Sequence, residues 1–384
     1  MTGTAAGGRG SEFRPELEGL RAVAVGLVVL YHGGISALAG GFVGVDVFFV
    51  LSGFLITGLI VRELRETGTL SLPGFYARRA RRLLPAAAIV LVATVVASAV
   101  VMPPLRMPDV AGDAAAAAVY ASNLRFALQA TDYLAAELAP SPLLHFWSLG
   151  VEEQFYLFWP ALLALVAVGL GRWRAASGSR LDGSAERRLD GSAERRLMWV
   201  VAGVAVASFA LGVVLTDIAE PWAFFSLPAR AWELALGALI ALGVARLSRL
   251  PRAIGGPTVA AGLAMVVVAG LALNETIPFP GLAALLPTGG AALVIAGSVV
   301  DRGSLPAQLL AVPPMRFLGR ISYSLYLWHW PLFVLPAVAL DRELPVLARL
   351  GLAGVAVLLA AATRLWVEDR LRLGRWAGTV PRRD

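Results

Sequence analysis

The sequence predicts an all-α polytopic membrane protein with about ten transmembrane helices and both termini in the cytoplasm. First, 58% of its 384 residues are hydrophobic, whereas a soluble domain has roughly 45–50%. Second, apolar runs of about 20 residues, the length that crosses a bilayer as a helix, recur along the chain. Third, the arginines are divided unequally between the two sets of alternating loops. These observations exclude a large soluble enzyme.

The apolar runs predict ten spans, and an even number places both termini on one side of the membrane. The predicted spans are 17–38, 41–61, 83–102, 146–170, 198–216, 226–245, 254–273, 282–300, 317–340 and 347–366.

All 33 basic residues are arginines, and 28 of them lie on the side of the termini under this assignment. Because positive charge concentrates on the cytoplasmic side, both termini are predicted to be cytoplasmic. The five arginines on the other side are Arg106, Arg125, Arg230, Arg342 and Arg349.

One membrane domain, 17–370, is predicted between cytoplasmic tails at 1–16 and 371–384. The extracytoplasmic segment 103–144 contains an Ala-rich run with a short apolar core, which we interpret as an amphipathic helix at the outer interface. If the Ala-rich run were counted as a transmembrane span, the Arg-rich loop 172–197 would lie on the extracytoplasmic side of the membrane. This loop carries RLDGSAER twice and is predicted to be a solvated, cytoplasmic linker.

The composition also limits the chemistry. The absence of cysteine excludes disulfides, thiolate metal sites and a cysteine nucleophile. Three histidines without an HExxH motif give no expectation of a metal site or of a tightly bound cofactor. The net charge of +7 indicates contacts with the bilayer or with phosphates rather than with nucleic acid. No feature of the sequence indicates an oligomeric state.

The run RAVAVGLVVLYH begins with Arg21 and ends with His32. A separation of eleven residues puts both side chains on one helix face, roughly 16 Å apart. Ionisable residues within a bilayer are rare and usually functional. The structural alternative is that Arg21 anchors the helix at the interface while His32 binds a neighbouring helix.

Asp46 and Ser52 are the polar positions of the second span. Asp46 is expected to cap a helix, to pair with an arginine or to hold a histidine tautomer. Ser52 is not in a nucleophile elbow, because GxSxG and a preceding strand are absent.

The segment FYARRARRLLP brings Arg78, Arg79 and Arg82 to the entry of the third span. The positive-inside rule explains such a cluster by itself. Guanidinium groups at a helix N-terminus, where free N–H groups also point outward, would in addition form a site for a phosphorylated ligand.

The fourth span begins with HFWSLGVEEQFYLFWP. His145 and Glu152 share a face, with Glu152 about 10 Å deeper, whereas Glu153 points about 100° away. A carboxylate at that depth needs a partner. In the sixth span, Arg230 and Glu233 are spaced as an i,i+3 pair, for which a structural ion pair is favoured over ligand binding.

In the ninth span, GRISYSLYLWHWPLF, the residues Ser322, Tyr326 and His329 share one face, and Tyr323 is a further candidate for binding. His329 lies about 13 Å beyond Arg320 along the helix. Because His32, Glu152 and His329 come from three spans and reach the middle or outer half of the bilayer, we expect an enclosed polar cavity.

With these segments identified, the chain resembles acyltransferase family 3, the bacterial integral-membrane O-acyltransferases. The resemblance covers about residues 14–335 and rests on the ordered set Arg-x10-His, GGFVGVDVFFVLSGFLIT, FYARRARRLLP, HFWSLGVEEQFYLFWP, RAWELALGALIA and GRISYSLYLWHWP. It implies transfer of an acyl group, often acetyl, from acyl-CoA to a hydroxyl group. Many members add an SGNH hydrolase-like domain, which this chain is expected to lack. The functional residues that it implies are Arg21, His32, Arg79, Arg82, Glu152, Arg230 and Glu233.

We therefore expect an acyl-CoA-dependent O-acyltransferase in the bacterial cytoplasmic membrane. The acceptor would be a glycan, a glycolipid or a glycosylated natural product such as a macrolide. A transporter or flippase that uses the midplane charges is the alternative, although the sequence shows no inverted repeat. His32 is expected to act as base, with Glu152 as its partner and Asp46 behind it, in direct transfer without an acyl-enzyme. Expected donor- or substrate-binding residues are Arg21, Asp46, Ser52, Arg78, Arg79, Arg82, His145, Arg230, Glu233, Tyr323, Tyr326 and His329.

Overall fold

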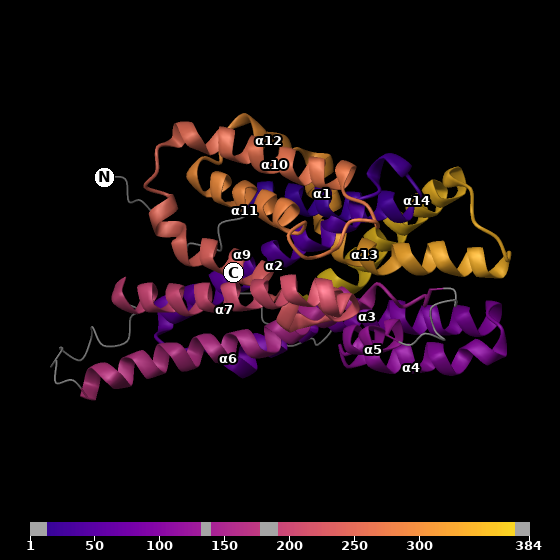
Figure 1. The fold of residues 1–384 in the computed structure, drawn as a ribbon, viewed down its shortest axis with the longest axis horizontal. Coiled ribbons are helices and arrows are strands. Elements are labelled where there is room, and N and C mark those ends of the chain that lie inside the picture. The colour runs from indigo at the N-terminus through magenta and orange to yellow at the C-terminus, as the bar shows by residue number, and fades with distance from the viewer. Residues whose placement is uncertain (1–13, 132–139, 177–190, 373–384) are drawn as a thin grey trace, which may run out of the picture.

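The structure is a computed structural model and describes residues 14–131, 140–176 and 191–372 (Figure 1). Most of both predicted tails and most of the tandem repeat lie outside these residues.

Within the described ranges the regular elements are helices, as the sequence predicts. The α-helices are α1 (Pro15–His32), α2 (Gly44–Thr67), α3 (Leu72–Val101), α4 (Met107–Ala118), α5 (Ser122–Ala130), α6 (Phe146–Ala176), α7 (Gly191–Ile218), α8 (Glu220–Phe225), α9 (Leu227–Leu247), α10 (Gly255–Ala272), α11 (Leu285–Val300), α12 (Leu305–Leu310), α13 (Pro313–Ala339), α14 (Val346–Thr363) and α15 (Asp369–Arg372). A π-helical turn, Arg364–Glu368, joins the last two.

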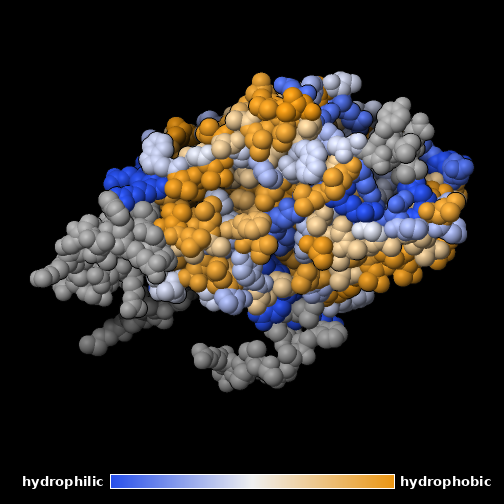
Figure 2. Space-filling view, turned by 60° about the horizontal axis from the view of Figure 1, so that its bottom comes forward, coloured by the Kyte–Doolittle hydropathy of each residue, from blue (hydrophilic) through white to orange (hydrophobic). Residues whose placement is uncertain are grey.

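Seven of the described helical segments are long and apolar enough to cross a membrane, and apolar side chains cover much of the face in Figure 2. They are Gly41–Thr67, Leu72–Val101, Phe146–Val166, Arg195–Ile218, Glu220–Leu247, Arg252–Ala272 and Val346–Glu368. The other three predicted spans correspond to α1, α11 and α13. Of these, α1 carries several charged residues and α11 has only 16 residues.

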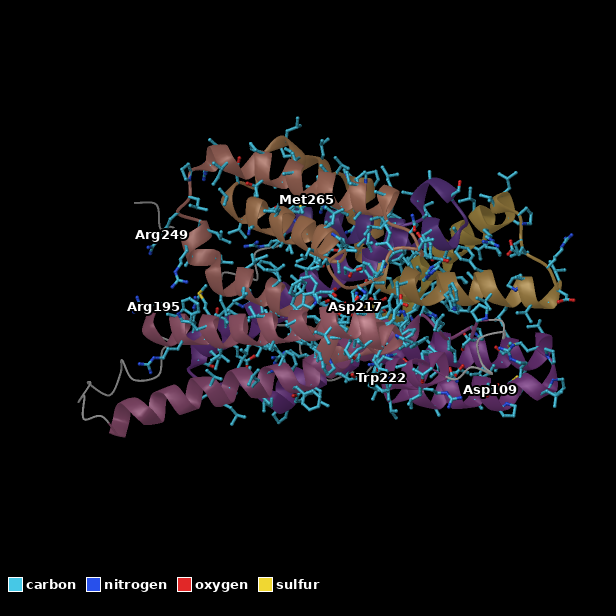
Figure 3. All side chains as sticks on the ribbon, in the orientation of Figure 1. Asp109, Arg195, Asp217, Trp222, Arg249 and Met265 are labelled. Atoms are coloured by element: carbon cyan, nitrogen blue, oxygen red, sulfur yellow. The ribbon has the colours of Figure 1, made fainter. Side chains whose placement is uncertain are left out.

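Helix α1 lies inside the bundle and packs against α2, α12 and α13, while α2 packs against α9 and α10 against α11 (Figure 1). Arg195 and Arg249 lie toward one end of the molecule, and Asp109 lies toward the other (Figure 3). We call the first of these the end at the start of α1, and the second the end at the end of α1.

Helices α4 and α5 form a hairpin that packs on α3 and α6. At its tip, Gln154 donates a hydrogen bond to the carbonyl of Tyr120 (2.9 Å), and Asn123 donates to the carbonyl of Phe225 (3.0 Å). Gln154 lies roughly 12 Å along α6 from its first residue, Phe146. The segment thus forms two helices where one was predicted, and its place at the outer interface stays a prediction. Non-helical backbone is tolerated at this depth because protein groups satisfy its hydrogen bonds.

Glycines set the closest helix crossings. A Cβ atom on Gly53 of α2 would lie 1.8 Å from the carbonyl oxygen of Leu234 in α9, and one on Gly237 would lie 2.0 Å from that of Val50. A Cβ atom on Gly319 of α13 would lie 1.8 Å from the carbonyl oxygen of Glu18 in α1. The backbones therefore touch, as is common where small residues line a membrane helix interface.

Gly53→Ala should lower the thermal unfolding temperature of the purified protein, because the added methyl group forces α2 and α9 apart. Gly58→Ala is the matched control, since nothing lies within 4 Å of a Cβ atom at that position of the same helix. Equal unfolding temperatures for the two variants would contradict the close crossing.

Candidate active site

A polar cavity of about 120 Å³, here called the glutamate cavity, lies toward the start of α1. Its lining residues include Arg21 on α1, Ser52 on α2, Arg79 and Arg82 on α3, Glu152 on α6 and Tyr323 on α13. The cavity thus combines residues from five helices that are far apart in the sequence.

The two glutamates of this cavity have different partners. Glu152 accepts hydrogen bonds from the hydroxyls of Ser52 and Tyr156. Glu153 forms an ion pair with Arg79 (3.1 Å), and the Arg79 guanidinium lies 3.5 Å from the centroid of the Tyr156 ring. Both glutamates line the cavity although they are 100° apart on the helix, because α2 and α3 approach α6 from different sides.

Helix α3 begins at Leu72, where Ser71 caps it by accepting a hydrogen bond from Gly74 (3.3 Å). Arg79 and Arg82 therefore lie inside the helix, where the backbone N–H groups are already bonded. The predicted anion site at free N–H groups is wrong, and the guanidinium groups alone provide positive charge. Arg78 pairs with Glu63 (2.9 Å) and does not line the glutamate cavity.

A second cavity, of about 370 Å³, lies at the end of α1 and is here called the aromatic cavity. His32, His145, Phe42, Trp147, Phe279 and Trp330 are among its lining residues. Tyr326 lines both this cavity and the glutamate cavity. The Tyr326 hydroxyl donates to the carbonyl of His145 (3.0 Å) and lies 2.6 Å from Ser148 Oγ.

His32 and His329 form a hydrogen-bonded pair. His32 Nδ1 lies 3.0 Å from His329 Nε2, and His329 Nδ1 lies 2.6 Å from the carbonyl oxygen of Tyr326. Because a carbonyl only accepts, His329 Nδ1 carries a proton, and in a neutral ring its Nε2 is then an acceptor. His32 must donate from Nδ1, which leaves its own Nε2 unprotonated and able to take a proton.

The expectation that Glu152 or Asp46 is the partner of His32 is wrong. Glu152 contacts Ser52 and Tyr156 in the glutamate cavity, and Asp46 pairs with Arg230 (2.8 Å). The partner is a histidine, because the crossing of α1 and α13 brings His329 to the end of α1.

Asp46, Arg230 and Glu233 form a buried triad whose side chains are at most 1% exposed. Arg230 binds Asp46 at 2.8 Å and Glu233 at 2.7 Å, and its guanidinium lies 5.5 Å from the ring centroid of Phe49. None of these three residues lines the glutamate cavity or the aromatic cavity. The structure thus gives Asp46 the arginine-pairing role and confirms the predicted i,i+3 pair.

Several lining residues were not predicted. Tyr156 and Tyr120 line the glutamate cavity. In the aromatic cavity, Tyr31 donates a hydrogen bond to Glu275 (2.6 Å), and the Trp330 ring centroid lies 4.6 Å from that of His32. Tyr156 could have been found from its i+4 spacing to Glu152, but Glu275 lies in a loop with no local signal. Among the described residues, no three His, Asp or Glu side chains are grouped to hold a metal ion.

The fold and these cavities define a multi-pass membrane protein with charged and aromatic side chains in cavities between its helices. The chain belongs to acyltransferase family 3, since the family model described as an acyltransferase domain matches residues 14–365. The matched region covers most of the chain, from the first residues of α1 to the end of α14.

Two curated relatives support this assignment. The chain is 30% identical over 371 residues to a peptidoglycan O-acetyltransferase of Listeria monocytogenes, a match that covers 94% of this chain and 55% of the relative. It is also 30% identical to an O-acetyltransferase of Staphylococcus aureus, covering 94% of this chain and 57% of the relative. The chain thus spans little more than half the length of these relatives. No solved structure matches it. These relatives and the apolar helices place the chain in the bacterial cell membrane.

Arg230→Met should destabilise the protein by about 3–5 kcal/mol, because it leaves two buried carboxylates without their cation. Arg78→Met, which breaks the exposed pair with Glu63, should cost less than about 1 kcal/mol. Thermal unfolding of both variants in detergent measures the difference. If the triad is structural, adding Asp46→Asn and Glu233→Gln to Arg230→Met should recover part of the loss, and a lack of recovery would contradict it.

Proposed function

We propose that this protein is an O-acyltransferase that transfers an acyl group, most simply acetyl, from acyl-CoA to a hydroxyl group of a cell-wall glycan. The observation that carries the proposal is the His32–His329 pair, which leaves a basic nitrogen on His32. His32 lines the aromatic cavity, and Tyr326 lines both this cavity and the glutamate cavity, which holds the arginines.

The arginine distribution supports cytoplasmic entry of the donor. The start of α1 then faces the cytoplasm under the positive-inside rule. Arg21, Arg79 and Arg82 line the cavity at that end, and guanidinium groups bind phosphates as forked donors. The phosphates of CoA would bind near these arginines, and the thioester would extend along α1 past Tyr326 toward His32.

The acceptor would enter from the end of α1. The aromatic cavity offers ring faces together with Glu220, Asn274 and Glu275, and such side chains can stack on a sugar ring and bind its hydroxyls. The name of the Listeria monocytogenes relative favours a glycan over a glycosylated natural product such as a macrolide as the acceptor.

In the proposed reaction, the acceptor hydroxyl oxygen attacks the thioester carbonyl while His32 Nε2 takes the hydroxyl proton. The C–S bond then breaks, and His32 returns the proton to the departing CoA thiolate. His329 acts as a positioning residue, because its Nε2 accepts from His32 Nδ1 and so maintains the required tautomer.

Arg79→Ala and Arg82→Ala should each raise the KM for acetyl-CoA about tenfold or more, as expected when a hydrogen bond to a charged group is lost. Lysine at either position should restore only part of the affinity for acetyl-CoA, because an ammonium group lacks the forked N–H donors of a guanidinium group. Release of CoA is measured with a thiol reagent, and a protein without cysteine gives no background. Arg81→Ala is the control, since Arg81 bonds the carbonyl of Ala77 and does not line the glutamate cavity. An equal KM for the three variants would contradict the proposed donor site.

His32→Ala should lower the rate of acyl transfer by about 10²-fold or more while acetyl-CoA still binds, because the general base is lost.

His329→Leu should lower kcat more than KM, because the tautomer of His32 is no longer held. His329→Gln should restore part of kcat, since its amide oxygen can accept the same hydrogen bond. Equal rates for the Leu and Gln variants would exclude the positioning role of His329.

Mass spectrometry of protein incubated with donor alone should find no acyl adduct, and a stable adduct would exclude direct transfer.

A further inference from the structure

A third cavity, of about 970 Å³, also reaches His32 and is here called the wide cavity. It lies between the end of α3, at Met102, and the last turns of α13, at Val338. Trp330 and His32 line both the wide and the aromatic cavities. A volume of this size is enough for a ligand larger than one sugar ring. The proposed reaction places the donor in the glutamate cavity and the acceptor in the aromatic cavity, and it leaves the wide cavity without a role.

The wide cavity collects most of the positive charge at this end of the bundle. Arg125 is bound to Asp113 (2.6 Å), and Arg230 is enclosed in the buried triad. The other three arginines on this side of the predicted topology, Arg106, Arg342 and Arg349, all line the wide cavity. Arginines are scarce on this side of the membrane, so their convergence on one cavity that contains His32 indicates binding of a negative charge.

Arg349 lies beside the chain that follows the end of α1. A Cβ atom on Gly34, two residues beyond His32, would lie 3.2 Å from Arg349 Nη1. The backbone φ of +81° at Gly34 favours glycine, and the absent side chain leaves the space that the guanidinium occupies. A group bound by Arg349 would therefore lie close to a hydroxyl at His32.

The wide cavity also contains Asp341 and Glu343, which oppose this positive charge. Both are exposed, and the side chain of Glu343, 3.8 Å from Arg349, is 96% exposed, whereas that of Arg349 is 25% exposed. Water and salt screen exposed charges more than partly buried ones. Arg349, the less exposed partner of this pair, should therefore attract an anion more strongly than Glu343 repels it.

We propose that the wide cavity binds an anionic group, a carboxylate or phosphate, of the acceptor while His32 activates a nearby acceptor hydroxyl. This proposal rests on the proposed function and specifies its acceptor as a negatively charged glycan. Arg349 and Arg342 are its specificity-determining residues, and the sugar ring that is acylated occupies the aromatic cavity on the other side of Trp330.

The test compares two forms of one acceptor, a peptidoglycan disaccharide with its free carboxylate and the methyl ester of the same disaccharide. The full chain is reconstituted in nanodiscs of zwitterionic lipid, and acetyl transfer is followed by mass spectrometry. The wild-type protein should have a KM about tenfold lower for the carboxylate than for the ester. Arg349→Gln should bring this KM ratio close to one.

Arg342→Gln is the second variant, because Arg342 is exposed and its loss leaves the packing at Gly34 intact. It should reduce the ratio by a smaller factor. Arg125→Gln is the matched control, since Arg125 is also on this side but does not line the wide cavity, and its KM ratio should equal that of the wild type. A wild-type ratio near one, or an equal loss in Arg125→Gln, would overturn the proposal.

Three further outcomes separate the possible failures. If the ratio is near one in zwitterionic lipid and anionic lipid raises the transfer to both forms equally, the arginines bind a lipid headgroup and the proposal is wrong. If acetyl-CoA is consumed and both forms are acetylated equally, the proposed function stands and the anionic site is wrong. If neither form is acetylated and CoA is not released, the proposed function itself fails, and this inference fails with it.

Discussion

The packing of α1 against α13 is the interaction on which the candidate site depends. Glu18 contacts Gly319 near the starts of the two helices, and His32 contacts His329 near the end of α1, so the helices run in the same direction. The first contact requires glycine, because a Cβ atom at position 319 would lie 1.8 Å from the carbonyl oxygen of Glu18. Because the backbones touch there, α13 stays close enough to α1 for two imidazole rings to share a hydrogen bond.

The cost of charge in an apolar surrounding explains why the ionisable residues fall into two groups. Arg230 is fully buried, and it is neutralised by Asp46 and Glu233 in direct contact. Such a triad joins α2 to α9 and lines neither the glutamate cavity nor the aromatic cavity. The cavity residues Arg79 and Glu153 are about 20% exposed, so these charges retain contact with solvent and can exchange partners.

The polar residues are ordered along α1 in a way that fits a two-substrate reaction. Arginines and glutamates lie near its start, Tyr326 lies between the cavities, and the histidine pair lies at its end. Under the proposed function, each substrate meets the charges that suit it on its own side of the membrane.

The sequence alone determined the features that depend on local spacing. Apolar runs of about 20 residues located the helices, because a bilayer requires that length. The helical period placed Ser322, Tyr326 and His329 on one face, and the i,i+3 spacing identified the pair of Arg230 and Glu233. The ordered motifs were enough to indicate the family.

Only the tertiary structure decided which residues meet between helices. The sequence left three roles open for Asp46 and named the wrong partner for His32, because nothing in local periodicity says which helices pack together. The hairpin of α4 and α5 was missed for the same reason, since the backbone at its tip accepts a hydrogen bond from Gln154 on α6. Contacts such as that between His32 and His329, 297 residues apart, depend on where glycines let helix backbones touch, and this is a property of the assembled bundle.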